Sequence, residues 1–200
     1  MQSSLPLIED AIRRGEERLT EKLGEPVTIN FRTYMDDRLL EKITEIDHEK
    51  FRSDLWYSRD ELVEKSKMKD FLCLIVHNKG EPVAFLYGYD DEFDSHWFFL
   101  DEIAARPEGK GIGKVLIVLL LVYCFELNYT FITLYTEDQD EKGRRLREFY
   151  EHLGFTYMGT EPELGVIMKY KIDEQELLKL YNRVMYSEGG PYPPYLASSS

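Results

Sequence analysis

The sequence has no apolar run long enough to cross a membrane. Its longest uninterrupted apolar stretch spans 11 residues, 115–125, whereas a bilayer-spanning helix needs about 20. Glu9 and Asp10 lie near the start, where a secretory signal would have lysines before an apolar run. Cysteine is also scarce, and Cys73 and Cys124 both lie within apolar runs, which is typical of buried thiols in a reducing compartment. We therefore expect a cytoplasmic protein without membrane contact.

Basic residues are outnumbered. The sequence contains 25 lysines and arginines but 38 aspartates and glutamates, which gives a net charge of −13 at pH 7. Such a surface repels the phosphate backbone of nucleic acids, so we expect no direct nucleic-acid partner. The same charge suits cationic partners such as amines, although acidic surfaces also serve solubility alone. The four histidines show no metal-ligand spacing, and with the apolar setting of the cysteines this predicts that no metal is bound.

The 200 residues fit one domain of ordinary size. Hydrophobic periodicity predicts helices over 5–23, from about 36 and from 58, and strands over 27–32, 71–76, 83–89 and 96–105. The next predicted element is a helix that is apolar on nearly every side (112–127). After it we expect a strand (129–135), a helix (140–153), a strand (166–172) and a helix capped by Asp173. Because short turns join the three central strands, the predicted fold class is mixed α/β (α+β) rather than doubly wound.

Only the two ends of the chain resemble additions to a central domain. We divide the sequence into an N-terminal amphipathic helix extension (1–26), a central domain (27–172) and a C-terminal helix with a Pro/Tyr/Ser tail (173–200). The tail from Ser187 has turn and polyproline character, which suits a partner-binding peptide as well as a frayed terminus.

One turn contains residues that point to chemistry. Residues 107–114 read Pro-Glu-Gly-Lys-Gly-Ile-Gly-Lys and join a strand to the apolar helix. Glycines let backbone N–H groups converge, and a helix N-terminus adds positive partial charge, so the turn favours a phosphate. It is not a Walker loop, because Glu108 and Val115 stand where that loop needs glycine and a hydroxyl residue. The dinucleotide fingerprint is excluded too, since Lys114 takes the place of its third glycine.

Two longer stretches extend this observation. Residues 100–116 read Leu-Asp-Glu-Ile-Ala-Ala-Arg-Pro-Glu-Gly-Lys-Gly-Ile-Gly-Lys-Val-Leu, and residues 146–155 read Leu-Arg-Glu-Phe-Tyr-Glu-His-Leu-Gly-Phe. In this order, with one strand between them, they resemble the two signatures of the GNAT superfamily of N-acetyltransferases. The resemblance implies a central, mostly antiparallel sheet that splays between two strands, with helices on both faces.

The resemblance also implies a co-substrate, acetyl-CoA, in the cleft where the two strands part. Backbone groups of Ile103, Ala104 and Ala105 would pair with the pantetheine arm and polarise the thioester carbonyl. Backbone amides of the loop would hold the pyrophosphate; these belong to Gly109, Lys110, Gly111, Ile112, Gly113 and Lys114. Tyr150 aligns with the tyrosine that similar enzymes use as a general acid toward the departing thiolate, although packing on the core is the other interpretation of this residue.

The acceptor amine must lose a proton before it attacks, because a lysine-like amine has a pKa of about 10.4. A carboxylate usually removes it, directly or through water. Glu102 is the favoured candidate, and Asp101, Glu137 and Asp138 are the alternatives. Since side chains alternate along a strand, we expect adjacent Asp101 and Glu102 to face opposite sides, so that only one reaches the cleft.

Aromatic residues beside carboxylates suit a cationic acceptor. By resemblance, the acceptor pocket is walled by the connection between two helices and by the central hairpin, which carry Trp56, Tyr57, Tyr87 and Tyr89. Trp56 and Tyr57 fit equally well as plugs of the core. A protein, a peptide, a polyamine and a small aminated metabolite all remain possible acceptors, and exposed strand edges make a homodimer plausible.

The chain departs from the usual family pattern at two positions. Glu108 takes the place of an arginine or glutamine, and Gly143 takes the place of an asparagine. A carboxylate beside a pyrophosphate must turn away or pair with a cation, and Lys110 and Arg106 are the nearest in sequence. We expect an acetyl-CoA-dependent N-acetyltransferase; the alternatives are a transferase for a longer acyl group and an inactive relative that binds CoA or another protein.

Overall fold

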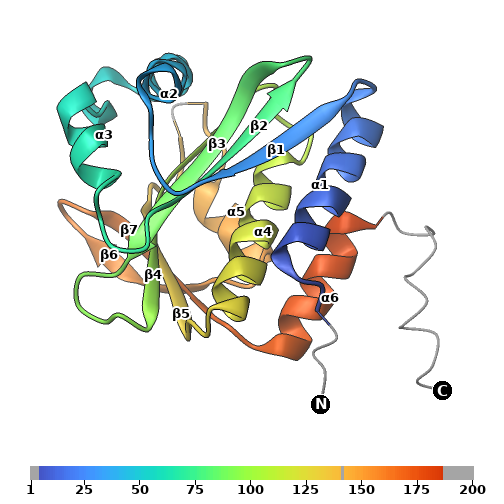
Figure 1. Ribbon diagram of the computed structural model, residues 1–200. Helices are drawn as coiled ribbons and strands as arrows, with labels where there is room; N and C mark the ends of the chain where they lie inside the picture. Colours follow the sequence, from blue (N-terminus) through green and yellow to red (C-terminus); the bar gives the residue numbers. More distant parts are fainter. Residues whose placement is uncertain (1–4, 141, 187–200) are drawn as a thin grey trace.

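A seven-stranded sheet forms the centre of the computed structural model, which describes residues 5–140 and 142–186 (Figure 1). The strand order is β1-β2-β3-β4-β5-β7-β6, and every neighbouring pair is antiparallel except β4 and β5, which are parallel. This confirms the predicted mixed, mostly antiparallel class. The strands are β1 (Val27–Arg32), β2 (Leu72–Asn78), β3 (Glu81–Asp90), β4 (Trp97–Ala105), β5 (Phe131–Thr136), β6 (Thr156–Glu161) and β7 (Gly165–Lys171).

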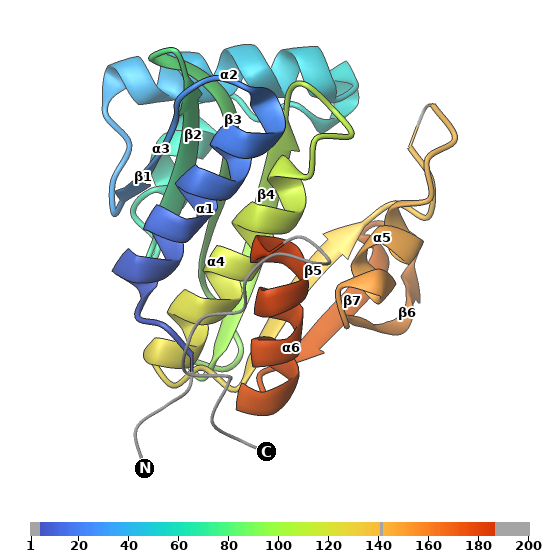
Figure 2. The same ribbon diagram turned by 90° about the vertical axis from the view of Figure 1, so that its right-hand side faces the viewer.

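The sheet splays between β4 and β5, as expected. Residues 97–100 of β4 pair with residues 131–134 of β5, and there the pairing ends. Beyond this point β4 pairs only with β3, while β5 pairs only with β7 (Figure 2). The edge of β4 that faces β5 is therefore open over residues 101–105, and unpaired backbone at such an edge is free to bind an extended ligand.

Helices cover both faces of the sheet. On one face α1 (Ile8–Leu23), α4 (Ile112–Glu126) and α6 (Glu174–Met185) lie side by side, and α5 (Leu146–His152) joins the same core (Figure 2). On the other face α2 (Asp37–Lys50) and α3 (Arg59–Lys65) cover a second core. Helix α4 is apolar all round because it packs on the sheet and is flanked by α1 and α6.

The two terminal helices share the main core. Leu19 of α1 and Leu177 of α6 are fully buried in the cluster that contains α4. Gly15 permits a close approach of α1, because a Cβ there would lie 3.1 Å from Val115 Cγ1. The tail beyond residue 186, where a polyproline segment was expected, lies outside the described residues.

Three local predictions were wrong. Helix α5 begins only at Leu146, because the Asp140 side chain accepts hydrogen bonds from the backbone amides of Lys142 and Arg144, which therefore belong to a loop. The edge strand β6 was missed, since its side chains are mostly exposed on both faces and show no alternation. Finally, β2 and β3 extend to a two-residue turn, in which Lys79 and Gly80 have left-handed backbone (φ 53° and 80°).

Candidate active site

The glycine-rich turn between β4 and α4 has the geometry of an anion site. Gly109 and Gly111 adopt left-handed backbone (φ 75° and 79°), and Gly111 is the N-cap of α4. The first amides of a helix have no partner within the helix, so the N–H groups at the start of α4 are available to a ligand. A Cβ at Gly113 would lie 3.7 Å from Phe149 Cζ and 3.9 Å from Ile103 Cδ1, so this glycine lies between β4 and α5 at the splay.

Glu108 does not leave an uncompensated negative charge in this loop. Its carboxylate pairs with Lys50 Nζ (3.3 Å), Lys142 Nζ (3.4 Å) and the Arg144 guanidinium. Burial opposes ionisation, but these cations hold the pKa of Glu108 below its ordinary value. Neither partner suggested by the sequence is used, since Arg106 pairs with Glu45 and Glu49 instead. Arg144 also pairs with Asp140, and Lys50 lies 3.7 Å from Glu49, so the Glu108 charge is neutralised within a mixed network of ion pairs.

Tyr150 lies at the buried side of α5. It is 7% exposed, and its ring contacts the edges of Phe149 and Phe155, with ring centroids 5.2 and 5.5 Å away. Burial raises the pKa of Tyr150 well above its ordinary value, so the phenol keeps its proton. The hydroxyl forms no hydrogen bond with the residues that the structure describes. The ring thus packs in the core, while the hydroxyl is left for another partner.

Asp101 and Glu102 face the same side of the sheet, which corrects the expectation from strand alternation. Tyr87 pairs with Glu102, but the next residue, Gly88, pairs with Leu100, so Asp101 is the extra residue of a β-bulge. The bulge turns both carboxylates toward α2 and α3. Gly88 is required there, because a Cβ would lie 2.3 Å from the Phe99 carbonyl oxygen.

The Asp101 carboxylate is saturated by donors. It accepts hydrogen bonds from the hydroxyls of Tyr57 (3.0 Å) and Tyr89 (2.7 Å), and it pairs with Lys65 Nζ at 2.6 Å. Burial and the nearby Asp101 charge raise the pKa values of both tyrosines, so both remain donors. With its side chain only 3% exposed, Asp101 is an ordered anion that fixes three neighbours.

Glu102 is in a different situation. Tyr87, itself fully buried, donates a hydrogen bond to Glu102 Oε2, whereas Oε1 is buried with no donor among the described residues. The carboxyl group of Asp47, on α2, interacts with Glu102; Asp47 is only 2% exposed, and neither of its oxygens has a donor among the described residues. Burial and this second carboxyl raise the pKa of Glu102 well above its ordinary value, and burial raises the pKa of Asp47 too. Both effects favour the protonated form of the pair over the ionised form.

That Asp47 belongs to the site was not predicted from the sequence, although its position on α2 indicates a buried carboxylate. The inward residues of α2 include Leu40 and Ile43, and Asp47 follows them by seven and four positions, on the same stripe. A carboxylate on the buried stripe of an amphipathic helix is rare and needs a reason. Lys65, the partner of Asp101, was missed as well.

The other predicted acceptor residues are spread over a wider surface. Trp56 is 40% exposed and stacks on the His48 ring, with centroids 3.9 Å apart; its Nε1 donates to the Phe51 carbonyl. His48 Nε2 lies 3.9 Å from Asp47 Oδ2, which links this surface pair to the buried carboxyls. Tyr87 is a core residue. Glu137 pairs with Arg52 at 2.8 Å, so it is occupied in this structure.

Comparison with known proteins decides the family. The family model of the acetyltransferase (GNAT) family matches residues 36–155, more than half of the chain. The chain belongs to the GNAT acetyltransferase family. This GNAT domain contains the loop, the splay and both carboxylates, whereas α1 and α6 lie outside the matched residues. No curated protein sequence matches the chain.

Solved GNAT structures share the fold at low sequence identity. The ribosomal-protein-S18-alanine N-acetyltransferase of Escherichia coli is 16% identical (TM-score 0.59), over 74% of this chain and 94% of the other. The PaiA N-acetyltransferase of Thermoplasma acidophilum, solved with coenzyme A, is 19% identical (TM-score 0.58), over 72% and 99%. An aminoglycoside 6′-acetyltransferase type Ii is 19% identical (TM-score 0.62), over 72% and 97%.

The described residues contain neither a metal-binding cluster nor a membrane-spanning helix. No group of three or more histidine, cysteine, aspartate and glutamate side chains there is arranged to hold a metal ion. Within the same part of the chain, none of the helices combines the length and the apolar character needed to span a bilayer.

Proposed function

We propose that this GNAT protein transfers the acetyl group of acetyl-CoA to a primary amine. The observation that carries the proposal is the open edge of β4 over residues 101–105, which leads directly into the glycine-rich loop at the start of α4. One continuous surface thus offers hydrogen bonds to an amide-containing arm and an anion site to a pyrophosphate. A structural neighbour solved with coenzyme A supports this assignment.

Ile103 and Ala105 have their backbone groups at the open edge, since those of Arg106, and by alternation those of Ala104, face β3. The groups of Ile103 and Ala105 would hold the pantetheine arm beside the splay. A backbone N–H aimed at the thioester oxygen stabilises the negative charge that develops there during attack. Because such a donor is fixed before the reaction, it lowers the barrier without reorganisation. The loop amides of residues 109–114 would bind the pyrophosphate.

Glu102 is the proposed general base. An ordinary glutamate is a weak base at neutral pH, but burial and Asp47 raise the pKa of Glu102 toward the range in which proton transfer from an ammonium is effective. Asp101 is less suited, because two phenols and Lys65 already occupy its oxygens. Tyr87 would orient Glu102 through its hydroxyl.

Tyr150 is the proposed partner of the departing thiolate. A thiol has an ordinary pKa of about 8.5, and the pKa of Tyr150 is raised by burial. The tyrosine therefore stays protonated and donates a hydrogen bond to the sulfur as the C–S bond breaks.

The acceptor is proposed to enter on the α2/α3 side, past Trp56 and Tyr57. Aromatic faces and carboxylates attract a cationic amine before it loses its proton. Relatives of this fold are named for an alanine of a ribosomal protein and for aminoglycosides, so both peptide and small-molecule amines are reasonable acceptors to test.

The test is amine-dependent release of the free thiol of CoA from acetyl-CoA. A panel would contain a lysine peptide, a peptide with a free α-amine, a polyamine and an aminoglycoside. We expect at least one amine to raise thiol release above hydrolysis, and Glu102→Gln to abolish that increase. Acetyl-CoA binding without release for any amine would favour the alternative, an inactive GNAT module that binds the coenzyme.

A further inference from the structure

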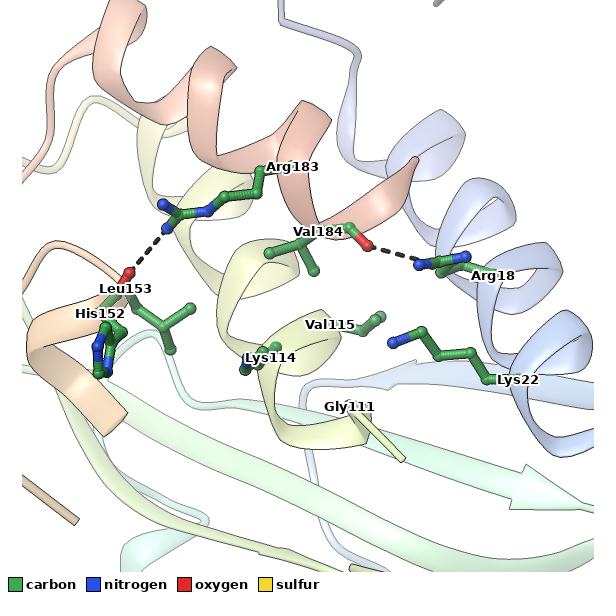
Figure 3. A pocket seen from close by; sticks show the side chains of 9 residues that line it. All are labelled: Arg18, Lys22, Gly111, Lys114, Val115, His152, Leu153, Arg183 and Val184. Carbon is green, nitrogen blue, oxygen red and sulfur yellow. Dashed lines mark hydrogen bonds between the residues drawn. The ribbon is translucent and has the colours of Figure 1, made fainter. Parts of the chain in front are cut away.

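A second feature of the molecule is a pocket of about 420 Å³ beside the glycine-rich loop. Helices α1, α4 and α6 and the end of α5 enclose it, and Figure 3 shows its lining side chains. We call it the terminal-helix pocket, because α1 and α6 supply much of its wall. Its lining is Arg18, Lys22, Gly111, Lys114, Val115, His152, Leu153, Arg183 and Val184.

Every titratable side chain in this lining is basic, on a chain whose net charge is −13. Arg183 donates to the His152 carbonyl at 2.7 Å, and Arg18 donates to the Val184 carbonyl at 3.3 Å, so both also cap neighbouring helix ends. Lys22 and Lys114 are different, because neither forms an ion pair or hydrogen bond within the described part of the chain. Capping therefore explains the arginines but not the lysines.

Lys22 is held against the loop itself. Its Nζ lies 2.9 Å from the position that a Cβ at Gly111 would take. Burial, Arg18 and Lys114 all lower the pKa of Lys22, which means that these cations repel one another in a partly dry site. A site that gathers like charges at a cost in stability is typical of binding sites for ions of opposite charge.

We propose that the terminal-helix pocket binds a phosphate monoester through Lys22, Lys114 and Arg183. Lysines act as point charges toward phosphate, and the planar guanidinium adds directed hydrogen bonds, so cations from three helices suit a tetrahedral dianion. Two of these three residues lie on α1 and α6, outside the matched family region 36–155. The terminal helices would thus give this protein a phosphate contact that the family region does not contain.

Two molecules could supply this phosphate. One is coenzyme A, whose ribose carries a 3′-phosphate; this form of the inference rests on the proposed function. The other is a free phosphorylated metabolite bound next to the coenzyme. Coenzyme A, dephospho-CoA (which lacks only the 3′-phosphate) and inorganic phosphate are the probes that separate them.

The experiment measures dissociation constants for wild type, Lys22→Gln and a control, Arg13→Gln, by titration calorimetry. Arg13 lies on the same helix, is exposed and pairs with Asp10, so its replacement removes one charge outside the pocket. If coenzyme A supplies the phosphate, wild type binds it about tenfold more tightly than dephospho-CoA. Lys22→Gln loses most of that preference, and Arg13→Gln keeps it.

If a free metabolite supplies the phosphate, both coenzymes bind alike, and inorganic phosphate binds the dephospho-CoA complex of wild type but not that of Lys22→Gln. The inference is overturned if the coenzymes bind alike and phosphate binds neither protein or both equally. Failure of both coenzymes to bind any variant would contradict the proposed function instead. Titration of inorganic phosphate into the free proteins, wild type and Lys22→Gln, would then test the pocket alone. Thermal unfolding without ligand checks folding, and Lys22→Gln should not lower the midpoint, because Lys22 has no partner to lose.

Discussion

The buried carboxyl groups of Glu102 and Asp47 face each other across the interface between β4 and α2. Two adjacent carboxylates in a dry site cannot both ionise without a large penalty, so the pair releases its last proton at higher pH than isolated carboxylates do. This relationship links stability to pH with a definite sign. Between the ordinary pKa of 4.5 and the raised pKa of folded Glu102, the unfolded chain has lost a proton that the folded chain still binds. The free energy of unfolding therefore falls as pH rises through this interval.

Replacing Glu102 by glutamine should remove this loss of stability at high pH, because glutamine does not ionise. We expect Glu102→Gln to be more stable than wild type at pH 8, by roughly 1–3 kcal/mol, with little difference near pH 4. Urea unfolding at several pH values measures it. A variant that is less stable than wild type at pH 8 would show that Glu102 is ionised and well solvated there.

Asp47→Asn should shift the pH dependence of turnover. Burial still raises the pKa of Glu102 in this variant, but the raising effect of the Asp47 carboxyl is gone. The acidic limb of the rate profile should therefore move to lower pH. An unmoved limb would mean that Glu102 is not the group that titrates in turnover.

Asp101→Asn should be costly to the fold. The buried carboxylate would no longer neutralise Lys65, and its two phenol partners would lose a charged acceptor. Breaking such a buried pair costs about 3 kcal/mol, which denaturant unfolding detects. An Asp101→Asn protein that is stable but inactive would instead favour Asp101 as the base.

Tyr150→Phe should lower kcat by about 10²-fold or more while leaving the unfolding midpoint nearly unchanged. The ring contacts with Phe149 and Phe155 remain, and the hydroxyl has no partner to lose within the described residues. Steady-state kinetics tests the expected loss of kcat, and thermal unfolding of the same preparations tests the expected unchanged midpoint. Unchanged turnover would reduce Tyr150 to a core residue.

The sequence predicts much of this protein because its informative signals are local. The glycines that open α4, the capping box of Ser58 and Glu61, and the apolar surface of α4 all act within a few residues. The splay between β4 and β5 was predicted by resemblance to the GNAT superfamily.

Features that depend on pairing between distant segments were not predictable in this way. The bulge at Asp101 exists because of how β4 registers with β3 at Gly88, and no pattern within β4 indicates it. The partners of Glu108 come from α2 and from the loop before α5, far away in the chain. The buried position of Asp47 could be predicted in part from its place on the helix, but its contact with Glu102 could not.

The most direct test of the central claim is thermal unfolding with and without saturating acetyl-CoA, on wild type and on Gly111→Ala. A ligand at 100 times its dissociation constant stabilises by about 2.7 kcal/mol, or roughly 5–10 °C for a domain of this size. Gly111→Ala forces a side chain into left-handed backbone and against Lys22, so its shift should be much smaller. Gly80→Ala, in the turn between β2 and β3, is the control, because it also forces a side chain into left-handed backbone (φ 80°) but lies outside the loop and meets no atom within 4 Å. A wild-type midpoint that acetyl-CoA does not move would contradict the assignment of the loop and the splay as a coenzyme site.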